Sequence, residues 1–161
     1  MELVASLTIA CGIMADEFSY RRNLPHWRSI EATYFVTWRL ASGQPGLLPG
    51  DRDLVMDALK NFDSERYELV AYVVMDDHVH VIVRPLPPHR LEQIVHSWKS
   101  FTAHRIRREG HRQRQVWQDE YFDRIVRDER ELQQKIEYIR ANPWKRWPDL
   151  ESYRWVWPLD D

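Results

Sequence analysis

The segment between residues 67 and 84 constrains the fold more than any other part of the sequence. Residues 67–75 and 78–84 are both rich in β-branched side chains, which favour strands. Asp76 and Asp77 separate the two runs, and aspartate is common in tight hairpin turns. The segment therefore predicts a β-hairpin near the middle of the chain.

The other expected elements follow from the spacing of apolar residues. Residues 32–40 alternate between two faces and predict a strand, and residues 121–127 predict a shorter one. Helical spacing predicts three helices: one capped by Asp51 or Asp53, one that ends at Gly110, and one from Asp128 to Pro143. The order is strand, helix, strand, strand, helix, strand, with one helix added. This is the split βαβ, ferredoxin-like pattern, so we expect an α+β sandwich whose antiparallel sheet carries helices on one face and an added C-terminal helix.

Length and cysteine content limit the domain organisation. With 161 residues and 43% hydrophobic content, the chain can bury the core of one compact domain and is too short for two. We expect residues 20–161 to form that domain and residues 1–19 to be disordered. Cys11 is the only cysteine, which excludes an internal disulfide and favours a reducing, cytoplasmic location with no membrane partner.

The charge of the chain is unevenly distributed. The formal net charge of −2 argues mildly against a nucleic-acid-binding protein. Between Trp98 and Arg114, however, Glu109 is the only acidic residue, and the candidate DNA-binding cations there are Lys99, Arg105, Arg107, Arg108, Arg112 and Arg114. Such a patch can attract phosphates, although a solvated helix end and loop is the simpler interpretation of a charge run.

His78 and His80 are the first candidates for chemistry. Side chains at i and i+2 of a strand share a face, so the two imidazoles project together while the valines between and after them line the other face. Two adjacent imidazoles suit one metal ion; the alternative is a histidine pair satisfied by hydrogen bonds beside the core. A histidine-triad hydrolase would need a third histidine where Ile82 stands, so that interpretation loses its central residue.

Tyr138 and Asn142 are the candidates on the last expected helix. At 100° per residue they lie within about 40° of each other around the helix axis, and Lys135 projects on the same flank. The alternative is that Tyr138 lies at the edge of the core and that Asn142 is a helix-end residue before Pro143. A free phenol is a poor nucleophile at neutral pH, so catalysis by Tyr138 would require a nearby cation.

Several segments together resemble one family. They are residues 21–27, 34–40, 78–80, 117–118, 121–123, 125–129, 138–143 and 152–155. In this ordered combination, which covers about residues 20 to 157, the chain resembles the REP-associated tyrosine transposases, a branch of the single-tyrosine HUH transposases with an IS200-like domain. Two positions depart from the pattern: Arg124 stands where relatives often have histidine, and Trp144 replaces the small aliphatic residue that usually follows Asn-Pro.

The resemblance implies a function and a site. It implies that His78, His80 and Asn142 hold a divalent metal, Mg²⁺ or Mn²⁺, and that Tyr138 attacks single-stranded, hairpin-bearing DNA to form a 5′-phosphotyrosine. Cleavage then becomes strand transfer, by a monomer or a homodimer. Lys145 and Arg146, beside Trp144 and Trp147, are further candidates for DNA contacts, and Lys135 is a candidate support for the phenolate or a phosphate.

Two other functions remain open. A ferredoxin-like nucleic-acid-binding module without catalysis would keep the basic patch, but it would have no need of Tyr138 and both histidines. A metal-dependent phosphoesterase that uses water would keep the ligands but form no covalent adduct. An assay that scores cleavage and adduct formation separates the three.

Overall fold

The hairpin expected between residues 67 and 84 forms the middle of the sheet. The computed structural model describes residues 32–110, 112 and 114–159. Within them, β2 (Tyr67–Val74) pairs antiparallel with β3 (His78–Pro85), and β3 pairs antiparallel with β1 (Tyr34–Arg39). The turn between β2 and β3 contains Asp76 and Asp77, as predicted.

Two short strands complete the sheet. β4 (Phe122–Ile125) pairs with the outer side of β1, and β5 (Val156–Trp157) pairs with the outer side of β2, so the order is β4-β1-β3-β2-β5. All four pairings are antiparallel. The first four strands have the order of a ferredoxin-like sheet, which confirms the expected α+β fold. β5 was not predicted because two residues carry no readable periodicity.

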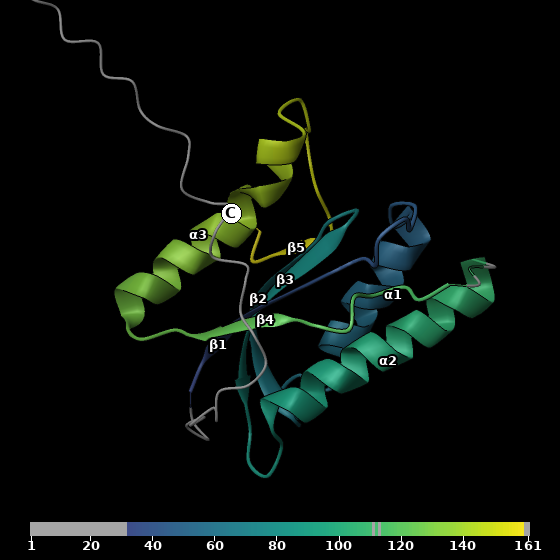
Figure 1. Ribbon diagram of the computed structural model, residues 1–161. Coiled ribbons are helices and arrows are strands. Elements are labelled where there is room, and N and C mark those ends of the chain that lie inside the picture. Colours follow the sequence, from purple (N-terminus) through teal and green to yellow (C-terminus); the bar gives the residue numbers. More distant parts are fainter. Residues whose placement is uncertain (1–31, 111, 113, 160–161) are drawn as a thin grey trace, which may run out of the picture.

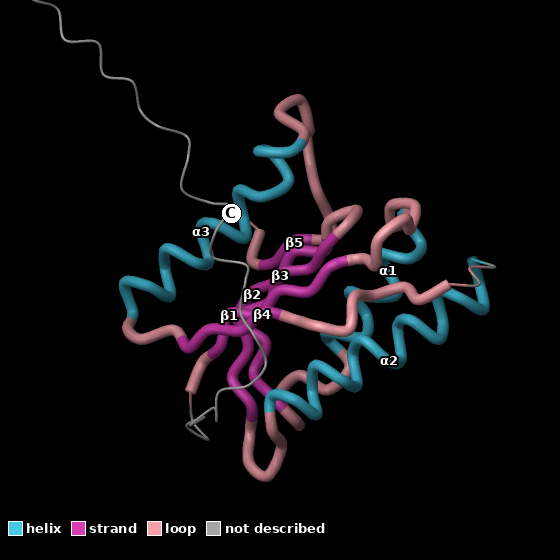
Figure 2. Tube along the Cα trace, in the orientation of Figure 1, coloured by secondary structure: helices cyan, strands magenta, loops and turns pink. Residues whose placement is uncertain are grey.

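The helices lie in two layers on opposite faces of the sheet (Figures 1 and 2). α1 (Pro49–Lys60) and α2 (Leu91–Gly110) pack on the face that carries Val79, Val81 and Val83. α3 (Glu129–Arg146) packs on the other face, through Ile139 against Ile82 and its neighbours. Among the described helices, α3 is therefore the only one on this face of the sheet.

Both ends of α3 can be explained by local chemistry. The Asp128 carboxylate accepts a hydrogen bond from the Glu131 amide at 2.8 Å, which is the predicted N-cap. The predicted end at Pro143 is wrong, because α3 continues through it to Arg146. Pro143 is buried, and the Trp144 indole donates to the Leu150 carbonyl at 2.9 Å, so packing of this last turn outweighs the lost backbone bond.

The start of α1 also differs from expectation. The cap position is Leu48, and Asp51 lies inside the first turn, where its carboxylate accepts from the Leu48 amide at 3.0 Å. Asp53 instead pairs with Arg154 at 2.6 Å.

Some predictions fall outside the described residues. They are the predicted disorder of residues 1–19 and the family resemblance of residues 21–27. The predicted single domain over residues 20–161 is described only from residue 32. Within the described part of the chain, no helix is both long and apolar enough to cross a membrane.

Candidate active site

β3 presents His78 and His80 to the α3 side of the sheet, as its alternation predicts. Their ring centroids lie 4.6 Å apart, and only 8% and 2% of the two residues is exposed. The neighbouring valines point into the opposite core. The two imidazoles therefore form one buried pair on a rigid central strand.

Each imidazole has a hydrogen-bond partner at Nδ1. His78 Nδ1 lies 2.6 Å from the Asp77 carboxylate, and His80 Nδ1 lies 2.6 Å from the Thr37 hydroxyl. Metal-binding histidines usually hold their second ring nitrogen in this way, which leaves Nε2 for the ion. Neither partner was predicted from the sequence, because Asp77 was interpreted as a turn residue and Thr37 lies in a distant strand.

The electrostatic surroundings favour neutral imidazoles. Burial lowers the pKa of His78, and the hydrogen bond with Asp77 offsets this only in part. Burial, followed by the nearby charges of His78, Arg39 and Lys135, holds the pKa of His80 well below its usual value. Neutral imidazole is the form that coordinates a metal, so this donor pair fits a divalent cation.

The Asp77 carboxylate is kept ionised. Burial raises the pKa of Asp77, but the hydrogen bond and charge of His78, together with the more distant Arg146 and Arg39, outweigh burial and leave that pKa below its usual value. An ionised Asp77 can accept the Nδ1 proton of His78 and fix the ring orientation.

α3 brings Tyr138 and Asn142 to the histidine pair. The ring of Tyr138 lies 5.3 Å from that of His80 and 6.1 Å from that of Phe35, measured between centroids. The Asn142 side chain is hydrogen-bonded to His78 and is 9% exposed. No group of three His, Cys, Asp or Glu side chains suited to a metal occurs in the described part of the chain. Among side chains of other types, Asn142 is hydrogen-bonded to His78, and its amide could supply an oxygen donor.

Comparisons with known proteins identify the family. The family model described as "Transposase IS200 like" matches residues 54–142, which is more than half of the chain and includes all four site residues. The chain belongs to the IS200-like transposase family.

Solved transposase structures share the fold of this family member. A REP-associated tyrosine transposase bound to a REP hairpin has a TM-score of 0.65 and 19% identity, with 83% of this chain and 82% of that chain covered. A protein from Deinococcus radiodurans R1 described as a transposase has a TM-score of 0.51 and 23% identity, with 71% and 95% covered. No curated protein matches the chain significantly.

Two lysines of this IS200-like domain lie beside aromatic rings of the candidate site. Lys145 Nζ is 4.8 Å from the centroid of the Tyr138 ring, and Lys135 Nζ is 4.8 Å from that of Phe35. Lys145, a candidate for DNA contacts, therefore flanks the candidate nucleophile. Positive charge at this position can stabilise a phenolate or a phosphate.

Three of the candidate DNA-binding cations are engaged within the domain. Lys99 donates to the carbonyls of Gln118 and Asp119 at 2.8 Å. Arg112 pairs with Asp51 at 2.9 Å, donates to two loop carbonyls, and has a side chain only 9% exposed. Arg105 pairs with Glu109 at 2.6 Å. These contacts give Lys99 and Arg112 structural roles that a charge pattern alone does not reveal.

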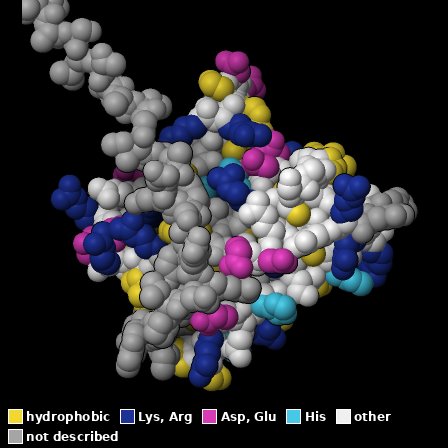
Figure 3. Space-filling view, viewed as in Figure 1, with side chains coloured by type: hydrophobic (Ala, Val, Ile, Leu, Met, Phe, Trp, Pro, Cys, Tyr) yellow, Lys and Arg dark blue, Asp and Glu magenta, His cyan; other side chains and the backbone are white. Residues whose placement is uncertain are grey.

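The remaining cations form two groups. Arg107, Arg108 and Arg114 are exposed at the end of α2 and just beyond it, in the helical layer on the far side of the sheet from Tyr138. Arg146 lies at the end of α3 and pairs with Asp76 at 2.9 Å. Figure 3 displays Lys and Arg side chains over α3 on the left and at the far end of α2 on the right.

The two departures from the family pattern have structural contacts. Arg124 of β4 pairs with Glu131 of α3 at 3.2 Å, which ties an edge strand to the helix of Tyr138. Trp144 packs with the α3 core and donates to Leu150, whereas Trp147 lines a surface pocket.

Proposed function

We propose that this transposase is a metal-dependent endonuclease and strand transferase for single-stranded, hairpin-bearing DNA, with Tyr138 as the nucleophile. One observation carries the proposal: a tyrosine on α3 lies beside a buried histidine pair whose Nδ1 atoms are already held by Asp77 and Thr37. A binding module without catalysis has no need of this combination.

The metal site that we propose consists of His78, His80 and Asn142. When bound there, Mg²⁺ or Mn²⁺ would offset the charge of the DNA phosphate and polarise its phosphorus. Asp77 and Thr37 orient the two imidazoles, and burial keeps both rings neutral. The Asn142 amide supplies the oxygen donor, one helical turn after Tyr138.

The proposed step exchanges one ester bond for another. The Tyr138 hydroxyl oxygen attacks phosphorus and forms the new P–O bond, while the bond from phosphorus to the 3′-oxygen breaks. The phenol proton is released, and the departing 3′-oxygen takes up a proton. The products are a 5′-phosphotyrosine and a 3′-hydroxyl, and attack by another 3′-hydroxyl reverses the step, so cleavage becomes strand transfer without a nucleotide cofactor.

Nearby cations support this chemistry. Lys145, 4.8 Å from the Tyr138 ring centroid, can stabilise the phenolate as its proton leaves. Lys135, on the same helix, can contact a non-bridging phosphate oxygen. The exposed Arg107, Arg108 and Arg114 would hold the phosphates of a more distant part of the same DNA.

The substrate and assembly are inferred from the family and the site. IS200-like transposases act on DNA, and a structurally similar transposase was solved with a REP hairpin, which supports a hairpin substrate. Because one chain contributes the histidines, Asn142 and Tyr138, we propose that a monomer suffices, although a homodimer could use the same site. We propose the cytoplasm as its compartment, where the single Cys11 stays reduced.

The Tyr138→Phe variant tests the proposal. It keeps the ring packing and removes only the hydroxyl, so hairpin DNA should still bind, but cleavage and the covalent adduct in Mn²⁺ should both disappear from a denaturing gel. Tyr121→Phe is the matched control and should cut normally. A water-using phosphoesterase would continue to cut after Tyr138→Phe, and a binding module would not cut at all; either result refutes the nucleophile.

The metal ligands need a separate test. His78→Ala and His80→Ala should each abolish Mn²⁺-dependent cleavage and weaken Mn²⁺ binding in a calorimetric titration. Wild-type affinity in either variant, with cleavage retained, would contradict the ligand assignment.

A further inference from the structure

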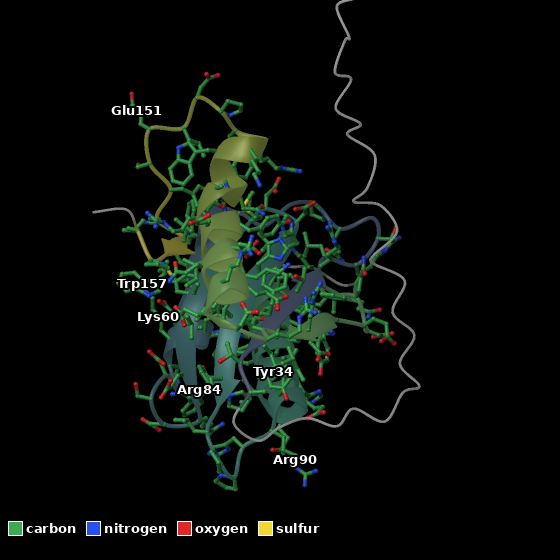
Figure 4. All side chains as sticks on the ribbon, turned by 90° about the vertical axis from the view of Figure 1, so that its left-hand side faces the viewer. Tyr34, Lys60, Arg84, Arg90, Glu151 and Trp157 are labelled. Carbon is green, nitrogen blue, oxygen red and sulfur yellow. The ribbon has the colours of Figure 1, made fainter. Side chains whose placement is uncertain are left out.

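A pocket of about 610 Å³ opens at the end of α3, outside the histidine and tyrosine site. One wall is Arg52 of α1, and the rest comes from Arg146 and the segment that leads from α3 to β5. Its size lies within the range of small-ligand sites. Figure 4 shows this segment rising past the end of α3 to a tip at Glu151 before it descends to β5.

Aromatic rings form much of the pocket wall. Trp147 and Tyr153 are stacked with 5.8 Å between their centroids, and Trp155 meets Tyr153 edge-on at 5.2 Å. Tyr153 is buried and fixed by a 2.7 Å hydrogen bond to the Val74 carbonyl, so the ring group is anchored to the sheet. Trp147 is only half-buried and can offer a flat apolar surface to a ligand.

Arg52 gives the pocket a positively charged wall. Its guanidinium lies 4.0 Å above the Trp155 ring and donates to the Tyr153 hydroxyl at 3.1 Å. Its Nε is buried and has no hydrogen-bond partner among the described residues. Arg146 adds a second cation 5.6 Å from the Trp147 ring. Asp149 is the only acidic residue of the lining. Arg146 pairs with Asp76, outside the lining, through Nη2 and is 45% exposed, so both guanidinium groups can still meet an anionic ligand.

Flat rings beside guanidinium groups match the chemistry of a nucleotide. An unpaired base stacks on an aromatic face, and the phosphate next to it pairs with arginine. A simple inorganic anion would leave the aromatic wall unused, and an apolar ligand would leave the charge of Arg52 without an anionic partner.

The pocket lies close to the proposed scissile phosphate. Trp147 follows Tyr138 by nine positions of α3 and its cap, or about 13 Å along the axis. At ~3.4 Å per stacked nucleotide, this separation corresponds to at most about four nucleotides. On the pocket side, Arg146 pairs with Asp76, and the adjacent Asp77 holds His78.

We propose that this pocket binds one unpaired nucleotide of the substrate strand, within about four nucleotides of the phosphate that Tyr138 attacks. The proposal rests on the proposed function for its substrate. Trp147 stacks on the base, and Arg52 and Arg146 hold the adjoining phosphate. The pocket thereby sets which unpaired position of the DNA reaches the tyrosine.

An abasic scan tests the assignment. A fluorescent hairpin oligonucleotide with single-stranded flanks is bound by the full chain in EDTA, with one base at a time removed near the cleaved position. In the wild type, one position should weaken binding by about 5- to 150-fold, the contribution of one stacked base. Trp147→Ala should weaken binding of intact DNA by a similar factor. In this variant, removal of the base at that position should cause no further loss of affinity.

Two further variants separate stacking from folding. Trp147→Leu keeps apolar bulk without the aromatic face and should behave like Trp147→Ala, while thermal unfolding checks that both variants fold. Trp157→Ala is the matched control, because Trp157 is half-exposed on β5, on the side of Lys60 in Figure 4, and does not line the pocket. It should keep the wild-type abasic profile. Arg52→Met should reduce the slope of log affinity against log salt by about 0.7.

The outcomes distinguish this proposal from the proposed function. If no abasic position matters, or if Trp147→Ala retains the wild-type profile, the pocket assignment is overturned even where the Tyr138 adduct forms. If the adduct fails to form but Trp147 and one base prove coupled, the pocket stands and the nuclease assignment fails.

Discussion

Thr37 is the hydrogen-bond partner of His80 at Nδ1, although it is far away in sequence. Thr37 is only 3% exposed, and its hydroxyl is 2.6 Å from His80 Nδ1. Thr37→Val nearly preserves the shape but removes this partner, so we expect Mn²⁺ affinity to fall about 10- to 100-fold, as measured by calorimetry. Thr102→Val is the matched control, because Thr102 is an equally buried threonine whose hydroxyl accepts from the Trp117 indole in the other core. It should lower stability and leave Mn²⁺ affinity unchanged; equal losses in both variants would mean that Thr37 acts only through folding.

Arg112 and Arg107 are neighbours in the basic run with different expected roles. Arg112→Ala removes the cationic partner of the Asp51 carboxylate, which keeps only its bond from the Leu48 amide, and the donor to two loop carbonyls. The free energy of unfolding in urea should therefore fall by about 3 kcal/mol. Arg107→Ala removes an exposed charge and should change stability by less than about 0.5 kcal/mol, while the slope of log DNA affinity against log salt falls by about 0.7. The assignment is wrong if Arg107→Ala lowers the stability and Arg112→Ala changes only the salt dependence of DNA binding.

At the scale of single elements, the N-cap of α3 stabilises the helix that carries Tyr138. Asp128→Ala removes the hydrogen bond to the Glu131 amide, and the expected cost is about 0.5–2 kcal/mol in urea unfolding. Glu137→Ala, at an exposed position in the middle of the same helix, should stay within about 0.5 kcal/mol. A loss of equal size in both variants would indicate general helix propensity in place of capping.

The elements with strong periodicity could be predicted from the sequence, and the contacts between distant segments could not. β1, β3 and α2 follow from regular alternation or helical spacing. Strand alternation predicts that His78 and His80 share a face, and helical spacing places Tyr138 and Asn142 on one flank of a helix, while their proposed roles come from the family resemblance. Thr37 and Asp77, in contrast, act through pairing and turn geometry. The Arg52 pocket joins α1 to the segment before β5, and no local pattern connects those parts of the chain.

At the scale of the whole molecule, α3 packs against the strands of its own chain. Ile139 shares a core with Ile82, and Tyr138 lies beside His80 of the same sheet. A mixture of His80→Ala and Tyr138→Phe proteins should therefore regain no cleavage, because neither chain holds a complete site. Recovered activity in the mixture, at protein concentrations where each variant alone is inactive, would mean that chains exchange α3.

The register of β1 against β3 places a strict condition on this chemistry. Thr37 lies opposite His80, and Arg39 lies opposite His78. A slip of β1 by one residue would turn Thr37 and Arg39 to the other face of the sheet and bring Val36 or Trp38 against the imidazoles. A chain with misaligned strands would therefore lack the proposed activity. The activity measured for a preparation would then depend on the fraction of molecules whose sheet has the correct register.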